Sequence, residues 1–372
     1  MSEPFHDSDS DLDRNGSPLE DAPQRGNPQS QWDSQENENV DEHPVMAELV
    51  ENENMSGRSS MLERETQNQD RWWTAVVMTL VSLVSFLMGS GIMLIIAIPV
   101  ITGEFSEEIF SNPALLEQKM ADVSSSRLGL FLILVLPQIT LVLPCLIAAA
   151  LSPVPFKQRL GLVRGNWPIW SWFAVGAASP LVGILSGLLV GVFMEESENL
   201  QQMSEVFRNH GKSGFFIPLA LMIGATPAFC EELLFRGYIQ QRLTRSFRPS
   251  WGILIASFLF AAFHMDFVHV VAVFPLGLFL GWITWRCGSL IPAMLGHFVN
   301  NFVSVIGIVV APEENQDVLE LPAATLTLSV FVFGLIGMAM IAVAIYRDRT
   351  NSETAQLSNE IDETVSYSDA PH

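Results

Sequence analysis

Three short groups of polar residues interrupt apolar stretches of the sequence, and their side chains could together hydrolyse an amide bond. They are CEELLFRG at residues 230–237, FAAFH at 260–264 and HFVNN at 297–301. Ionisable groups within hydrocarbon are costly and usually have a function or a partner. Amide hydrolysis needs an activated water, a group that takes and returns its proton, and donors directed at the oxygen that becomes negative. These residue types supply all three.

The first group contains two adjacent acids and an arginine. Glu232 and Arg236 are four residues apart, so on a helix they share a face and can neutralise each other, which lowers the cost of burying both. Glu231 is rotated by about 100° from Glu232 and has no basic residue four positions away. Glu231 is therefore the carboxylate left free to act as a base, and Glu232 and Arg236 are predicted to support it. The alternative for this pair is an ordinary salt bridge at a helix end.

The other two groups place histidines where they could assist that base. His264 could hold the same water or shuttle its proton, and Phe260, one turn earlier, could form a wall of the site. His297 and Asn301 are four residues apart on one helix face and could donate hydrogen bonds to an oxyanion. Taken alone, a histidine such as His264 is more often a packed side chain bonded to a backbone carbonyl. The presence of all three groups favours catalysis.

Apolar runs long enough to cross about 30 Å of hydrocarbon define the elements that must position these side chains. We predict an all-α polytopic membrane protein of about eight transmembrane helices, with the three groups on helices four, five and seven. The predicted spans cover residues 73–101, 128–151, 167–194, 215–235, 251–268, 270–285, 289–311 and 324–346. The sixth span is short and follows the fifth almost directly.

Basic residues give an independent check, because Lys and Arg collect in short cytoplasmic loops. If both termini are cytoplasmic, the basic residues that follow spans two, four, six and eight all lie on one side of the membrane. These are Lys157, Arg159, Arg164, Arg236, Arg242, Arg245, Arg248, Arg286, Arg347 and Arg349. The opposite connections are rich in acids. We therefore predict a multi-pass integral membrane protein with both termini cytoplasmic.

The charge of the chain is concentrated at its two ends. The 372 residues carry a formal net charge of −21. Residues 1–70 hold 18 acids and four arginines, and residues 347–372 hold six acids and two arginines, so the middle is nearly neutral. We predict disordered acidic cytoplasmic tails at 1–70 and 347–372 on either side of a membrane domain at 71–346. Such segregated charge is not typical of a nucleic-acid-binding protein.

The depths of the polar groups raise a geometric difficulty. If span four ends where its apolar run ends, Glu231 lies about 6 Å from the cytoplasmic edge, whereas His264 lies about 20 Å deep. The two meet only if the helices tilt, if Pro227 kinks span four, or if span five begins earlier, near Ser246. Pro227 also leaves the Ile223 carbonyl without its helical donor.

The three groups fit E-E-x-x-x-R, F-x-x-x-H and H-x-x-x-N in that order, and in this the chain resembles the CPBP family of intramembrane proteases, named for CAAX and bacteriocin processing. The resemblance covers about residues 215–311. It implies an α-helical membrane endopeptidase with a cavity open to the cytoplasm. The implied roles agree with those argued from spacing. Glu231 and His264 activate water, the second glutamate and the arginine orient the site, and the third group forms an oxyanion pocket.

Metal dependence is left open by the sequence. Members of the family are often labelled metalloproteases, and Glu231, His264 and His297 could supply the three protein ligands of a catalytic zinc site. The chain has no H-E-x-x-H sequence, and a metal-free glutamate mechanism needs the same residues. We favour the metal-free mechanism and name no other cofactor.

The predicted function is an intramembrane endopeptidase that acts on a peptide or a lipidated protein in or at the membrane. Known members of the family remove the last three residues of prenylated CAAX proteins, and others are linked to peptide maturation or bacteriocin immunity. One alternative is a non-catalytic scaffold or immunity protein. Another is a proton-coupled transporter, but the internal repeats typical of transporters are not visible in the sequence. The sequence determines neither the substrate nor the oligomeric state.

Overall fold

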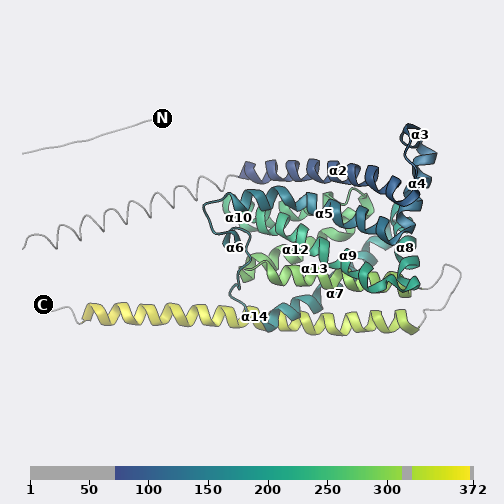
Figure 1. Ribbon diagram of the computed structural model, residues 1–372. Coiled ribbons are helices and arrows are strands. Elements are labelled where there is room, and N and C mark those ends of the chain that lie inside the picture. Colours follow the sequence, from purple (N-terminus) through teal and green to yellow (C-terminus); the bar gives the residue numbers. More distant parts are fainter. Residues whose placement is uncertain (1–71, 312–320, 369–372) are drawn as a thin grey trace, which may run out of the picture. The chain divides into compact units, whose positions relative to one another are not determined.

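Helices make up all the regular secondary structure in the residues that the computed structural model describes, 72–311 and 321–368 (Figure 1). These residues belong to one unit of the chain, Met61–His372. The tail predicted at residues 1–70 lies outside the described residues. The predicted fold class, an all-α polytopic membrane protein, is confirmed.

Seven helices of the described residues are long and apolar enough to cross a membrane, one fewer than predicted. They are α2 (Trp72–Thr102), α5 (Arg127–Ala150), α7 (Trp170–Phe193), a long helical segment (Glu198–Ser246), α12 (Phe267–Cys287), α13 (Ile291–Val310) and α14 (Leu321–Ser368). Three short helices lie in the connections: α3 (Glu107–Ser111), α4 (Pro113–Ser125) and α6 (Phe156–Arg159).

The segment Glu198–Ser246 carries the first polar group and continues further than predicted. It consists of α8 (Glu198–His210), η1 (Gly211–Phe215), where the chain kinks at Gly214 with φ of 81°, α9 (Phe216–Glu232), the π-helical η2 (Leu233–Gln240) and α10 (Gln241–Ser246). The predicted span ended at residue 235. Instead every side chain of η2 is buried. Its polar members find partners on α12, because Arg236 donates to the Gly277 carbonyl and Gln240 donates to the Gly281 carbonyl.

The predicted fifth span at 251–268 is too long. The helix there, α11 (Pro249–Ala262), has 14 residues and a length of about 21 Å, less than the hydrocarbon thickness of about 30 Å. Helix α11 ends at Ala262, and the turn that follows contains Met265 in a left-handed conformation, with φ of 55°. Asp266 then caps α12 by accepting a hydrogen bond from the His269 amide at 2.9 Å. The sixth helix therefore starts earlier than predicted and is long enough to span.

Helix α14 extends beyond the predicted end of the membrane domain. We predicted a disordered tail from residue 347, but the helix continues to Ser368. No proline or glycine follows Gly337 within it to end the helix. Asp348, the second residue of the predicted tail, forms an ion pair with Arg286 of α12. Residues 369–372 of the predicted tail lie outside the described residues.

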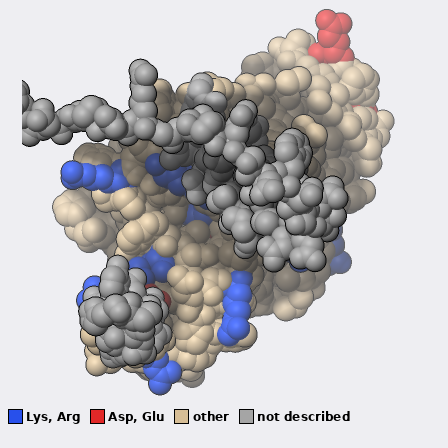
Figure 2. Space-filling model, turned by 90° about the vertical axis from the view of Figure 1, so that its left-hand side faces the viewer, with Lys and Arg blue, Asp and Glu red and all other residues tan. Residues whose placement is uncertain are grey.

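The connections that contain the basic residues lie together at one end of the bundle. Ring contact joins Trp72, at the start of α2, to Phe247 in the turn between α10 and α11. The Leu290 amide donates to the Gly161 carbonyl at 2.9 Å, which joins the connection between α12 and α13 to the one between α5 and α7. We call this the basic end. Figure 2 shows Lys and Arg side chains on this face.

The opposite end, called here the acidic end, holds the other connections. Ser197 caps α8 and donates to the Asp266 carboxylate at 2.6 Å, so the caps of α8 and α12 are joined. The Ser197 hydroxyl and the His269 amide hold the pKa of Asp266 below its usual value. The sidedness predicted from basic residues thus has a counterpart in the fold, except that Arg236 lies in the core. Which end faces the cytoplasm stays a prediction.

Candidate active site

The turn between α10 and α11 brings the first two polar groups to the same depth. Glu231 lies fifteen residues before Ser246, and His264 lies fifteen residues after Pro249. At about 1.5 Å per residue, each lies about 22 Å from the turn. Helices α10 and α11 pack against each other, so the two residues reach one level. The predicted difference in depth between Glu231 and His264 arose because span four was predicted to end too early. Helix α11 does not need to begin earlier than Pro249.

Glu232 joins two of the three groups through one buried oxygen. Its Oε1 accepts hydrogen bonds from Arg236 Nη1 at 2.8 Å and from His297 Nδ1 at 2.9 Å. All three side chains are buried, and the predicted Glu232–Arg236 pair is present. A buried charge pair is tolerated when additional hydrogen bonds satisfy it. The bond to Nδ1 also fixes the orientation of the His297 ring and leaves its Nε2 free for the site.

Glu231 keeps one carboxylate oxygen free. Its Oε1 accepts a hydrogen bond from Gln138 Nε2 on α5 at 3.0 Å. Its Oε2 is buried and lacks a hydrogen-bond partner among the described residues, and His297 Nε2 is 3.9 Å away, beyond hydrogen-bond length. Buried polar atoms without a partner are rare and often occur at catalytic sites. Glu231 Oε2 thus has no hydrogen bond among the described residues, and the role of Glu231 as a base stays a prediction.

Phe260, the side chain predicted to form a wall of the site, contacts a charged group and both histidines. Its ring is 1% exposed. The Arg236 guanidinium lies 4.2 Å from the ring centroid, a cation–π contact. The rings of His264 and His297 meet it edge-on, with centroids 5.4 and 5.7 Å away. The Phe260 ring therefore contacts both imidazoles and the guanidinium.

His264 lies at the end of α11, where the helix gives way to the turn. Its Nδ1 is 3.3 Å from the Phe260 carbonyl, which is the local bond expected of a packed histidine. Its ring also contacts His269 of α12, with centroids 4.5 Å apart. His264 and Glu231 line one cavity. No direct bond between them occurs in the described residues, so any cooperation requires a molecule between them.

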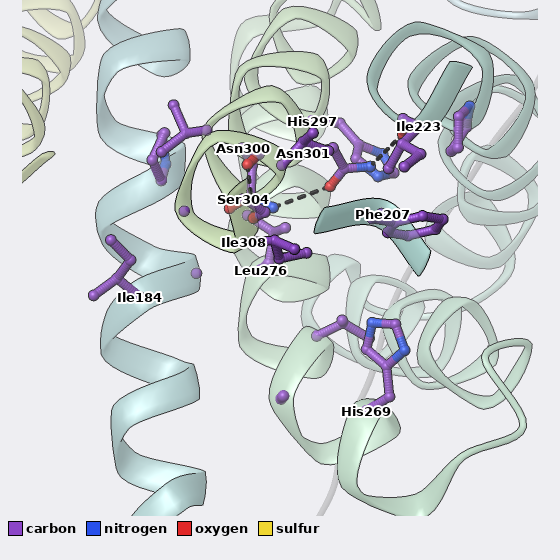
Figure 3. Close-up of a pocket in the computed structure, with 18 of the residues that line it drawn as sticks. Ile184, Phe207, Ile223, His269, Leu276, His297, Asn300, Asn301, Ser304 and Ile308 are labelled. Carbon is purple, nitrogen blue, oxygen red and sulfur yellow. Dashed lines mark hydrogen bonds between the residues drawn. The ribbon is translucent and has the colours of Figure 1, made fainter. Parts of the chain in front are cut away.

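Asn301 satisfies the backbone where Pro227 interrupts α9. Its Nδ2 donates to the Ile223 carbonyl at 3.2 Å, the carbonyl that the proline deprives of a helical donor (Figure 3). Its Oδ1 accepts a hydrogen bond from the side chain of Asn300 at 3.1 Å. An amide nitrogen carries two hydrogens, so Asn301 has a second donor to offer.

The predicted site residues Glu231, Phe260, His264, His297 and Asn301 line a cavity of about 600 Å³. Its remaining wall is mostly apolar and comes from α5, α7, α8, α9, α12, α13 and α14. The cavity extends from the level of Glu231 toward the acidic end, past Ser304 and Ile308 on α13 (Figure 3). No residue of the basic-end connections lines it. The lining residues therefore lie between the level of Glu231 and the acidic end. If the basic end is cytoplasmic, as predicted, this differs from the cavity open to the cytoplasm that the family resemblance implies.

Gln138 and His269 are polar residues of the cavity wall that were not predicted as site residues. Gln138 lies near the middle of span two, next to Pro137, and it was not predicted because it is an amide and not an ionisable group. His269 belongs to none of the three polar groups, but in the fold it lines the cavity (Figure 3), and its ring contacts that of His264. A polar residue in an apolar helix is the signal that identifies Gln138.

The candidate metal ligands do not form a metal site in this arrangement. Among the described residues, no three His, Cys, Asp or Glu side chains are grouped so as to hold a metal ion. His297 commits its Nδ1 to Glu232, which leaves only Nε2, and the ring of His264 packs against Phe260 and His269. We therefore derive no step through a metal.

Comparison with known families agrees with this set of residues. Residues 213–303 match the family described as type II CAAX prenyl endopeptidase Rce1-like. This segment is an Rce1-like domain. The Rce1-like domain contains all three polar groups, whereas Gln138 and α7 lie outside it. Searches of curated proteins and of solved structures found no match to the chain.

The Rce1-like domain and the seven apolar helices together describe a multi-pass membrane protein of a protease family. The likeness is consistent with the CPBP resemblance seen in the sequence. It covers α9 to the middle of α13, the part of the fold that carries Glu231, His264 and His297.

Proposed function

We propose that the chain is an intramembrane endopeptidase that hydrolyses a peptide bond with water activated by Glu231 and His264. The observation that carries the proposal is the free Oε2 of Glu231, buried at the wall of the cavity that the two histidines share. Glu232 bonds Arg236 and His297, and Gln138 bonds Glu231, so the neighbouring groups are held in place. Such preorganisation is what a hydrolytic site needs.

The proposed reaction begins when Glu231 Oε2 takes a proton from water. The water oxygen then bonds to the scissile carbonyl carbon, and the carbonyl oxygen becomes an oxyanion. Glu231 returns the proton to the amide nitrogen as the carbon–nitrogen bond breaks, which leaves a carboxylic acid and an amine. In this proposal His264, which lines the same cavity, holds the water.

The oxyanion would be bound by the third polar group. Asn301 has a second Nδ2 hydrogen beyond the one donated to Ile223. His297 can donate from Nε2 in its protonated form, since its Nδ1 already donates to Glu232. Removing one such donor in other enzymes typically costs about 10²–10³ in rate.

The proposed substrate is a peptide with an apolar or lipidated part. Beyond the polar groups the cavity is lined by Ile184, Val303, Ile308 and Leu326, which would accept an apolar chain. The family description names prenylated CAAX substrates for its members, and CAAX-type processing of this kind is our proposal for this chain.

Purified full-length protein in lipid nanodiscs would test the proposal with a farnesylated peptide ending in Cys-a-a-X and its unprenylated counterpart. Mass spectrometry should find one new carboxyl terminus, and Glu231→Gln should slow its formation by about 10²–10⁴. The control is Thr140→Val, whose hydroxyl bonds the Pro137 carbonyl of its own helix outside the cavity. A scaffold or a transporter would give equal results for the wild type and Glu231→Gln.

A further inference from the structure

We infer that Gln138 is a further active-site residue, which fixes Glu231 and binds the attacking water; the inference rests on the proposed function. Gln138 belongs to α5, which the Rce1-like domain at 213–303 does not include. Its amide reaches Glu231 across the helix interface and lines the same cavity.

The orientation of the Gln138 amide follows from chemistry. A carboxylate oxygen only accepts, so the group that faces Glu231 Oε1 at 3.0 Å must be the NH₂ of the amide. The carbonyl Oε1 of Gln138 therefore lies on the other branch of the same planar group. That oxygen is buried and lacks a hydrogen-bond partner among the described residues.

The bonded pair at the cavity wall thus carries two acceptors without hydrogen-bond partners among the described residues, Gln138 Oε1 and Glu231 Oε2. An unsatisfied buried acceptor destabilises the fold, so a purely structural glutamine would be expected to bond both ends of its amide. A molecule with two hydrogens to donate satisfies both acceptors, and water is that molecule in a hydrolase. One hydrogen points to the base that removes it, and the other fixes the direction of the oxygen lone pair.

Glu231 also gains a fixed rotamer from this contact. The bond from Gln138 Nε2 occupies Oε1, so the oxygen available as a base is always Oε2, the one 3.9 Å from His297. Without Gln138 either oxygen could turn toward His297 or the cavity. The geometry of the attack would then be lost even though the carboxylate remained.

Gln138→Met keeps the length and the apolar stem of the side chain but removes both polar ends. We expect kcat for the farnesylated peptide to fall about 10- to 100-fold, with KM within about threefold of the wild type, because the change acts on the water rather than on the peptide. Gln138→Glu should lose as much at neutral pH and recover activity as the pH falls. A protonated acid keeps one donor for Glu231, whereas a second carboxylate repels it.

Thr140→Val, two residues along α5, is the matched control and should keep the kcat of the wild type. An unchanged kcat in Gln138→Met, in a preparation where Glu231→Gln is inactive, would overturn the inference while leaving the proposed function intact.

A double-mutant cycle on thermal unfolding separates this inference from a failure of the proposed function. Gln138→Met leaves Glu231 Oε1 unpaired, and Glu231→Ala removes that oxygen, so the double variant should lose less stability than the sum of the single losses. If the wild type cleaves nothing, the proposed function fails and this cycle still measures the contact. Additive losses would overturn the contact, and the assignment of Gln138 with it.

Discussion

At the scale of single residues, the site depends on a buried carboxylate that bonds two partners through one oxygen. Glu232 is inaccessible to solvent and accepts hydrogen bonds from both Arg236 and His297. If it were lost, a buried arginine would remain without its charge partner, and His297 would lose the bond that orients it. The pair therefore serves both stability and the geometry of the oxyanion site.

Glu232→Gln should lower the stability of the protein by about 3–5 kcal/mol, the cost of breaking a buried pair by removing one partner. Thermal unfolding in detergent measures this. The control is Glu104→Gln, because Glu104 is 64% exposed although its partner Lys119 is only 10% exposed, so this pair should contribute less than the fully buried one. Equal unfolding midpoints for the two variants would contradict the account of the pair.

The residues that the sequence identified and those it missed differ in a physical way. Acids and histidines are conspicuous in an apolar stretch of sequence because burying them in hydrocarbon is costly. The i,i+4 rule paired Glu232 with Arg236 correctly. The link from Glu232 to His297 joins residues 65 positions apart and requires the fold. Gln138 carries no charge, so its burial in an apolar span looked ordinary.

At the scale of elements, the proline in α9 and the asparagine in α13 depend on each other. Pro227 removes the helical donor for the Ile223 carbonyl, and Asn301 replaces it from the neighbouring helix. The same asparagine is proposed to bind the oxyanion. A substitution that restores a backbone N–H at position 227 would separate the two roles of Asn301.

Asn301→Ala should destabilise the protein by about 1–3 kcal/mol, because a buried carbonyl loses its partner. Adding Pro227→Ala restores an N–H for Ile223 and should recover part of that stability without recovering cleavage. Unfolding midpoints and peptide cleavage rates measure the two effects. Recovery of both together would mean that Asn301 acts only by supporting the helix.

The helix boundaries are the part of the fold that hydropathy predicted least accurately. Hydropathy found every long span but ended span four at residue 235, since Arg236 and Gln240 look like the start of a loop. They are buried because the backbone carbonyls of Gly277 and Gly281 on α12 accept their hydrogen bonds. A pattern along one helix has no information about those acceptors. The left-handed turn at Met265 that shortens α11 was likewise not visible as an apolar run.

At the scale of the whole molecule, the two ends of the bundle differ in charge and in access to the cavity. The connections with the predicted cytoplasmic basic residues lie at one end, and the cavity extends toward the other. If the basic end faces the cytoplasm, substrates reach Glu231 from the opposite side or from within the bilayer. This differs from the cytoplasmic opening that the family resemblance implied.

Labelling of single cysteines from outside intact cells tests this orientation. In a variant lacking the three native cysteines, an impermeant thiol reagent should modify Ser304→Cys, which is exposed at the cavity wall near the acidic end. It should leave Arg248→Cys at the basic end unmodified until the cells are opened. The reverse pattern would place the cavity on the cytoplasmic side and the predicted termini outside.

The most direct measurement for the central proposal is chemical rescue of the base. In single-turnover cleavage of the farnesylated peptide, Glu231→Ala should reduce the rate by about 10²–10⁴. Added formate should then restore part of it in proportion to its concentration, because a small carboxylate can occupy the space left by the side chain. Cleavage by Glu231→Ala at the rate of the wild type without formate would contradict the assignment of Glu231 as the base.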